Sequence, residues 1–267
     1  MAWTDFLHRK PKKIGLSLSG GAIHGAAHIG VIQVLEREGI KAHIVTGTSA
    51  GAIIGAAYAA GVSTQDMDRL FREARWPSLV KLSWKNTLSL FDTQPLEDFI
   101  RTNICDLTFE ELPCKFATIA CDILTGERVV LNSGPMAPAV RASAAYPGLF
   151  SPIEMNGKLL VDGGAVDNLP SDLAREMGAD YVIGVDLSTP TRLTHAPENP
   201  FEVLMAFVNV MQARAALPEP ELNNCLIKPE VEEFSAWDLS IVDELEARGR
   251  AAAEKAIIKI KEDLGKK

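Results

Sequence analysis

The chain is poor in cysteine and has no long apolar run. Its four cysteines among 267 residues show no C-x-x-C spacing, so neither a disulfide framework nor a zinc site is expected. No stretch approaches the roughly 18 consecutive apolar residues of a membrane-spanning helix, and residues 1–13 lack the apolar core of a signal peptide. The sequence therefore predicts a cytoplasmic protein with no transmembrane segment and no bound metal.

Basic residues are also in deficit. Lysine and arginine number 27 against 35 aspartates and glutamates, a formal net charge of −8. This disfavours a nucleic-acid partner, because clustered basic residues are needed to neutralise phosphates. The exception is His8-Arg9-Lys10-Pro11-Lys12-Lys13. It predicts an N-terminal basic tail over residues 1–13 that is either solvated or in peripheral contact with anionic headgroups at the inner membrane surface.

Apolar residues make up 47% of the chain and charged residues 23%, which is typical of a globular protein. We expect one domain over residues 14–267, since this length suffices for one large core. Apolar runs alternate with helix-like stretches, which favours an α/β fold with a mostly parallel central sheet and helices on both faces. The predicted strands are 14–19, 42–46, 116–123, 129–132, 159–162, 181–187 and 225–228, and the predicted helices are 26–38, 50–61, 63–74, 95–104, 138–145, 171–177 and 241–264.

Ser49 is the candidate nucleophile. It lies at the centre of Gly47-Thr48-Ser49-Ala50-Gly51, between a predicted strand and a predicted helix of small residues. A serine at such a turn is held in a strained conformation with its hydroxyl exposed, and flanking glycines prevent backbone clashes. The alternative is an ordinary glycine and serine turn.

A second segment, Ser19-Gly20-Gly21-Ala22-Ile23-His24-Gly25, also joins a predicted strand to a predicted helix. Backbone N–H groups at such a junction favour a developing negative charge, as the oxyanion of acyl transfer requires. A dinucleotide-binding loop is the rival interpretation. Its G-x-G-x-x-G spacing is absent here.

A third segment, Lys158 to Gly164, delivers Asp162 from an apolar strand into Gly163-Gly164. Glycines beside a carboxylate let it approach a serine hydroxyl as a general base, although Asp-Gly is also a common turn. In parallel sheets, ligands bind beyond the carboxyl ends of the strands. Because all three segments lie at strand ends, we expect one shared crevice.

Together these segments resemble the patatin-like phospholipase family. The similarity spreads over residues 14–190 and rests on Leu18-Ser19-Gly20-Gly21 with Gly25 and residues 27–31, on the Ser49 motif, on residues 142–152, and on Asp162-Gly163-Gly164 with Asp167-Asn168-Leu169-Pro170. The resemblance implies a patatin-like three-layer architecture and a lipid acyl hydrolase that cleaves fatty-acyl esters, such as phospholipids or lysophospholipids, with a serine–aspartate dyad and no cofactor. It assigns Ser49 as nucleophile, Asp162 as base, the backbone of Gly20, Gly21 and Ala22 as oxyanion hole, and Gly25, Gly47, Gly51, Gly163 and Gly164 as supporting glycines.

Two positions depart from the family pattern. Ala22 stands where the family usually has a third glycine, and His24 stands where it usually has an arginine. A Cβ restricts the dihedral angles open to Ala22. Histidine, unlike arginine, changes charge near neutral pH, so activity is expected to depend on His24 protonation.

Several alternatives stay open. A serine–acid–histidine triad would use His195, the only histidine after Asp162. A non-catalytic lipid-binding or regulatory protein on the same scaffold is a second alternative, because fold does not guarantee activity, and an acyltransferase is a third. Residues 76–91 are either a lid that contacts acyl chains or an ordinary connecting segment.

Overall fold

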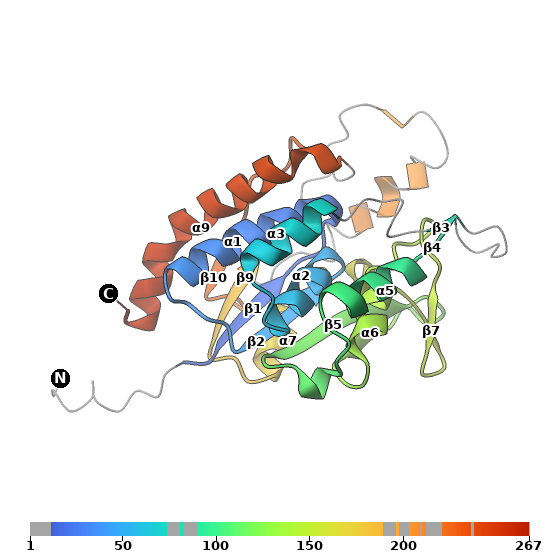
Figure 1. The fold of residues 1–267 in the computed structure, drawn as a ribbon, viewed down its shortest axis with the longest axis horizontal. Helices are drawn as coiled ribbons and strands as arrows, with labels where there is room; N and C mark the ends of the chain where they lie inside the picture. The colour runs from blue at the N-terminus through green and yellow to red at the C-terminus, as the bar shows by residue number, and fades with distance from the viewer. Residues whose placement is uncertain are drawn as a thin grey trace.

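One mixed sheet forms the centre of the protein. The structure is a computed structural model that describes residues 12–73, 81–82, 90–188, 196–197, 203–204, 206–208, 210–211, 221–235 and 238–266. The strands are β1 (Ile14–Leu18), β2 (Ile44–Thr48), β3 (Lys81–Leu82), β4 (Phe91–Asp92), β5 (Lys115–Asp122), β6 (Arg128–Leu131), β7 (Ile153–Met155), β8 (Lys158–Asp162), β9 (Tyr181–Val185) and β10 (Cys225–Ile227). The central sheet has the order β10-β9-β1-β2-β5-β8-β7, with β6 also paired to β5, while β3 and β4 pair separately (Figure 1).

The sheet has a parallel part and an antiparallel end. Strands β10, β9, β1, β2 and β5 run parallel to one another, and every residue of β1, β2 and β9 is buried, as expected for strands covered on both faces. Strands β6 and β8 run antiparallel to β5, and β7 runs antiparallel to β8. The predicted α/β fold is confirmed, and β7 is a strand that the sequence patterns did not predict.

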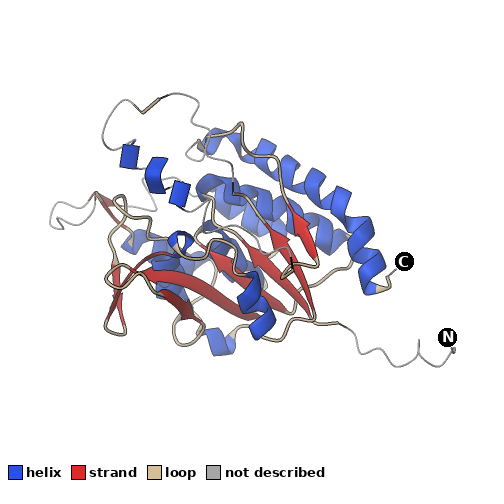
Figure 2. Ribbon diagram, turned by 180° about the vertical axis from the view of Figure 1, so that it is seen from behind, coloured by secondary structure: helices blue, strands red, loops and turns tan. Residues whose placement is uncertain are grey.

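The helices fall within two residues of the predicted bounds. They are α1 (Ala26–Arg37), α2 (Ala50–Ala59), α3 (Thr64–Glu73), α5 (Gln94–Asn103), α6 (Met136–Ser143), α7 (Ser171–Glu176) and α9 (Val242–Leu264), with short 3₁₀ turns η2 (Ala22–Gly25), η3 (Phe109–Glu111), η4 (Gly163–Ala165) and η5 (Leu239–Ile241). Helix α9 lies along α1, which lies beside α2 and α3 (Figure 1). Helix α7 packs on β1, β2 and β9 and is seen in front of the strands in Figure 2.

Alternation along β2 shows that the helices cover opposite faces. Neighbouring residues of a strand point to opposite sides of the sheet. Val45 belongs to the main apolar core with Ile29 of α1, whereas Ile44 packs with Ala174 of α7. The predicted arrangement of helices on both faces is therefore present.

Helices α1 and α9 cross at two glycines. A Cβ on Gly249 of α9 would lie 2.0 Å from the Ala27 carbonyl oxygen, and a Cβ on Gly30 of α1 would lie 2.1 Å from the Glu246 carbonyl oxygen. Such distances leave no room for any side chain. The crossing therefore fixes α9 against α1.

The predicted basic tail lies mostly outside the described residues, which begin at Lys12. Lys12 donates through Nζ to the Asp263 carbonyl oxygen at 2.7 Å and lies 5.4 Å from the centre of the Tyr181 ring. The Lys13 N–H donates to Asp180 Oδ2 at 2.8 Å. These two basic residues thus have partners within the protein.

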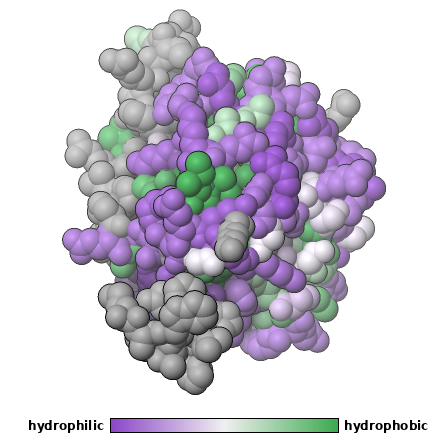
Figure 3. All heavy atoms as spheres, turned by 90° about the vertical axis from the view of Figure 1, so that its left-hand side faces the viewer, coloured by the Kyte–Doolittle hydropathy of each residue, from purple (hydrophilic) through white to green (hydrophobic). Residues whose placement is uncertain are grey.

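The end of the molecule that carries both termini is largely polar (Figure 3). One apolar patch stands at the centre of that view, and small isolated patches are ordinary at protein surfaces. Among the helices of the described residues, none has the length and apolar character needed to cross a bilayer.

At the glycine crossing, replacing glycine with alanine is expected to destabilise the protein, which is the reverse of its usual effect in a helix. Gly249→Ala should lower the free energy of unfolding by about 1–3 kcal/mol through overpacking, although alanine is favoured over glycine in a helix by up to about 1 kcal/mol. Urea unfolding measures the change. Ala251→Gly, at an exposed position of α9, calibrates helix propensity alone. A more stable Gly249→Ala variant would contradict the crossing.

Candidate active site

Strand β5 brings the predicted serine and carboxylate together. Because β6 pairs with one flank of β5, strands β2 and β8 both use the other flank. The last residue of β2, Thr48, pairs with Ile119, and the last residue of β8, Asp162, pairs with Ala120. Ser49 follows Thr48 directly. Ser49 and Asp162 therefore lie where two strands of opposite direction meet end to end.

The backbone at Ser49 has the strain predicted for a nucleophile elbow. Its φ of 54° and ψ of −119° lie in a region that costs a non-glycine residue about 1–3 kcal/mol. A Cβ on Gly47 would lie 2.3 Å from the Gly51 carbonyl oxygen, and a Cβ on Gly51 would lie 2.2 Å from the Leu18 carbonyl oxygen. Both supporting glycines are required by close backbone contacts.

The hydroxyls of Ser143 and Thr118 form hydrogen bonds with the backbone of the elbow. The Ser49 N–H donates to Ser143 Oγ at 3.0 Å, and the buried Thr118 hydroxyl lies 2.8 Å from Ser143 Oγ and 2.7 Å from the Gly47 carbonyl oxygen. Neither residue is among the predicted site residues. Ser143 lies within segment 142–152, whose resemblance to the family could have indicated a role at the site. No sequence pattern pointed to Thr118.

Asp162 is fully buried. Its Oδ1 accepts a hydrogen bond from the Gly164 N–H at 2.8 Å, and its Oδ2 has no hydrogen-bond partner among the described residues. Burial raises the pKa of Asp162 from 3.8 to about 6, while the nearby Ser49 hydroxyl and the Gly164 N–H oppose the rise. The Ser49 hydroxyl is thus close to the carboxylate but does not close a tight hydrogen bond, and such contacts commonly tighten only with substrate.

The predicted oxyanion loop lies beside the serine. A Cβ on Gly20 would lie 3.2 Å from the Ser49 Cβ. The Gly20 N–H, however, donates to the Asn168 carbonyl oxygen at 3.1 Å, so this amide is already occupied. The N–H groups of Gly21 and Ala22 have no acceptor among the described residues. The predicted donor set is thereby reduced to Gly21 and Ala22.

Ala22 adopts the conformation that the family's glycine would take freely. Its φ is 49°, in the left-handed region that costs alanine about 1–2 kcal/mol.

The supporting glycines Gly25 and Gly163 also lie in tight contacts. A Cβ on Gly25 would lie 2.9 Å from the Ala50 Cβ, and one on Gly163 would lie 2.3 Å from the Ile119 carbonyl oxygen. The amino ends of α1 and α2, which carry partial positive charge, thus meet beside Ser49.

The two histidines near the loop are both buried and hydrogen-bonded to backbone carbonyls. Buried His24 has Nε2 3.1 Å from the Phe234 carbonyl oxygen, and burial lowers its pKa below 6.5. Fully buried His28 donates through Nε2 to the Ser19 carbonyl oxygen at 2.8 Å, and burial lowers its pKa to about 4. The expected dependence of activity on His24 protonation stays a prediction. Because the pKa of His24 is lowered, the change in activity is expected at a pH below the ordinary histidine range.

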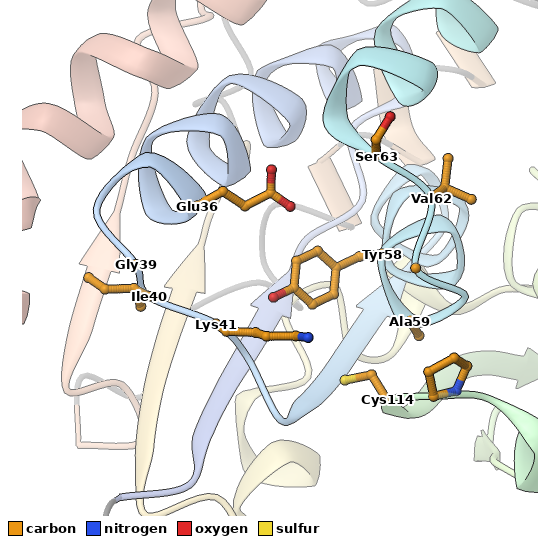
Figure 4. Close-up of a pocket in the computed structure, with 11 residues that line it drawn as sticks. Glu36, Gly39, Ile40, Lys41, Tyr58, Ala59, Val62, Ser63 and Cys114 are labelled. Carbon is orange, nitrogen blue, oxygen red and sulfur yellow. The ribbon is translucent and has the colours of Figure 1, made fainter.

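A hollow of about 440 Å³ opens at another part of the molecule (Figure 4). Lys41, Tyr58 and Cys114 are among its lining residues, and it lies at the carboxyl end of α2. Ser49 precedes the amino end of α2, which at 1.5 Å per residue places the two about 15 Å apart along the helix. This hollow is therefore separate from the candidate active site.

Some predicted features fall outside the described residues. His195, proposed for the alternative triad, is one of them, and most of the possible lid over residues 76–91 is another. Both stay predictions.

The fold is α/β, and it places a strained serine near a buried carboxylate. The family model of the patatin-like phospholipases matches residues 16–175. The chain belongs to the patatin-like phospholipase family.

Curated relatives agree with this assignment. The chain is 34% identical over 186 residues to an uncharacterized NTE family protein of Mycobacterium tuberculosis, covering 66% of this chain and 49% of the relative. It is also 34% identical over 186 residues to patatin-like phospholipase domain-containing protein 6 of Mus musculus, covering 66% of this chain and 14% of that protein. The chain thus spans about half the length or less of these relatives.

Solved structures share the fold. VipD from Legionella pneumophila matches with a TM-score of 0.56 and 16% identity over 95% of this chain and 67% of VipD. The type III effector protein ExoU matches with a TM-score of 0.51 and 17% identity over 92% of this chain and 52% of ExoU.

Burial of Asp162 predicts a pH-dependent stability difference. The folded-state pKa lies above the unfolded one, so the contribution to stability is full below about pH 4 and is lost as the pH rises through about 6. Asp162→Asn, which keeps the shape without the charge, should be more stable than the wild type at pH 8. The gap should be on the order of 3 kcal/mol, since each pKa unit corresponds to about 1.4 kcal/mol.

Chemical unfolding between pH 4 and pH 8 measures this gap, which should close toward pH 4. Asp98→Asn at an exposed position of α5 controls for the exchange itself. Parallel stability curves for Asp162→Asn and the wild type would show that Asp162 is not desolvated.

Proposed function

We propose that this protein is a serine lipid acyl hydrolase that cleaves fatty-acyl esters of phospholipids or lysophospholipids through an acyl-enzyme intermediate. The observation that carries the proposal is the end-to-end meeting of β2 and β8 on β5, which brings Ser49 beside Asp162. Membership of the patatin-like phospholipase family supports a fatty-acyl ester as substrate.

In the acylation step, Asp162 takes the proton of the Ser49 hydroxyl and Ser49 Oγ attacks the ester carbonyl carbon. A base is most effective when its pKa lies near the working pH. With a pKa of about 6, Asp162 is mostly ionised at neutral pH and still far more basic than an exposed aspartate.

Negative charge on the carbonyl oxygen would be held by the N–H groups of Gly21 and Ala22. Their amides have no other acceptor among the described residues, and the amino ends of α1 and α2 add a favourable potential. Asp162 then gives the proton to the leaving alcohol. A water molecule, deprotonated by the same carboxylate, attacks the acyl carbon, and Ser49 Oγ leaves with the proton from Asp162 as the fatty acid is released.

Ser49→Ala and Asp162→Asn test the dyad. Each variant should lower kcat for fatty-acid release at least about a thousandfold, because removing one member of a catalytic unit disables the whole. The assay compares lysophospholipids, phospholipids, acylglycerols and p-nitrophenyl esters. Ser133→Ala, at an exposed loop position, is the matched control and should keep wild-type turnover. Full loss in His195→Ala with activity kept in Asp162→Asn would instead contradict the Ser49–Asp162 dyad.

Rapid covalent labelling of Ser49 by a fluorophosphonate separates an enzyme from a non-catalytic lipid-binding or regulatory protein, because only an activated serine reacts quickly. Transfer of the acyl group to an added alcohol in preference to water would identify an acyltransferase instead.

The pH dependence of kcat/KM gives a further prediction. Since only ionised Asp162 can accept the serine proton, kcat/KM should rise with pH through an apparent pKa of about 6 and then level off. The measurement is a pH–rate profile between pH 4.5 and 8.5. A profile without this acid limb would show that Asp162 is not the base.

A further inference from the structure

One short segment behind the candidate site connects its parts. Residues 167–170 follow Asp162 and cross over the carboxyl ends of β1 and β2. Their backbone carbonyl oxygens accept hydrogen bonds from the nucleophile strand and from the oxyanion loop. The bonds run from Thr48 Oγ1 to Asp167 O at 2.9 Å, from the Gly20 N–H to Asn168 O at 3.1 Å, and from Thr46 Oγ1 to Pro170 O at 2.8 Å.

Arg128 of β6 holds this segment. Its Nη2 lies 2.7 Å from Asp167 Oδ2 and 2.9 Å from Asp172 Oδ1. The Asp167 side chain is only 15% exposed. Burial raises its pKa to about 6, and the Arg128 charge opposes that rise. A carboxylate so far from water is stable only with a partner, and Arg128 supplies one.

The position of Arg128 follows from the same strand that aligns the candidate dyad. Cys121 of β5 pairs with Arg128 on one flank and with Val161 on the other, so Arg128 lies level with the residue before Asp162. Arg128 Nε is buried without a hydrogen-bond partner among the described residues. An unpartnered buried donor is costly, which indicates that the side chain is held in place by its two carboxylates.

We propose that the Arg128–Asp167 ion pair is a positioning element for the candidate active site. It rests on the proposed function in so far as the positioned groups are catalytic. The ion pairs of Arg128 go to Asp167 and Asp172 and not to Asp162, so it acts through the 167–170 carbonyls. Without Arg128, the buried Asp167 carboxylate has lost its partner and moves toward water, and the Gly20 loop and the end of β2 lose their alignment.

The test compares Arg128→Gln, Asp167→Asn, the double variant and Arg128→Lys. Misplacement of reacting groups by about 1 Å can cost a hundredfold, so Arg128→Gln should lower kcat and the fluorophosphonate labelling rate about ten- to a hundredfold with KM little changed. Asp167→Asn, which keeps the shape, should show a smaller loss of the same kind. The double variant should be no worse than Arg128→Gln, because the two residues act as one unit.

Lysine can contact one carboxylate as a point charge, so Arg128→Lys should restore part of kcat. Lys158→Gln is the matched control. It removes the contacts of Lys158 with Glu127 at 3.0 Å and Asp122 at 3.8 Å, which do not involve residues 167–170, and it should keep wild-type kcat.

Hydrogen exchange at the Gly20 amide gives a readout without catalysis. That N–H is bonded to Asn168 O, so its exchange should be at least about tenfold faster in Arg128→Gln than in the wild type. A folded Arg128→Gln variant with unchanged Gly20 exchange and unchanged kcat would overturn the inference, as would strictly additive effects in the double variant. An unlabelled, inactive wild type with faster Gly20 exchange in Arg128→Gln would refute the proposed function but keep the positioning role.

Discussion

The candidate site depends on two strands of opposite direction that end on one flank of β5. Strand β2 ends opposite Ile119 of β5 and β8 ends opposite Ala120, so Ser49, which follows β2, and Asp162, which ends β8, must lie close together. Backbone hydrogen bonds of the sheet set this spacing, and they are more rigid than loops. The serine and the carboxylate therefore need no long loop to meet. Arg128 is positioned by the same strand, because it pairs with the other flank of β5.

Strain at the strand ends is balanced by packing behind them. Ser49 and Ala22 both have φ values in the left-handed region, and such residues persist only where the surroundings fix them. The helix behind Ser49 consists largely of small residues, with Ala52, Ala56 and Ala59 fully buried. Small side chains let α2 approach the sheet closely, and that packing offsets the cost of the turn.

Much of the fold and of the site could be predicted, because the signals are local. The Ser49 elbow depends on glycines two residues away, and the helices on apolar periodicity. The direction of β8 depends on the strand that it pairs with. The rule for parallel sheets predicts the correct place for Asp162, but β8 is antiparallel to β5, so the rule does not explain that place. The available signal was Asn156-Gly157, where both residues have positive φ and close the β7–β8 hairpin in the manner typical of that dipeptide. The occupied Gly20 amide and the Arg128 ion pair arise from contacts distant in sequence, which no local pattern reports.

The buried carboxyls of Asp162 and Asp167 are both desolvated, but their surroundings suit them to different roles. Burial raises the pKa of both Asp162 and Asp167 to about 6. Asp167 has a cationic partner at 2.7 Å, so its charge is used in holding the chain. Asp162 accepts one hydrogen bond, from the Gly164 N–H, and its other oxygen has no hydrogen-bond partner among the described residues, so its basicity is available to the nearby Ser49 hydroxyl. A cation beside Asp162 would stabilise the fold but lower that basicity. The absence of such a cation among the described residues is therefore the condition under which this carboxylate can act as a base.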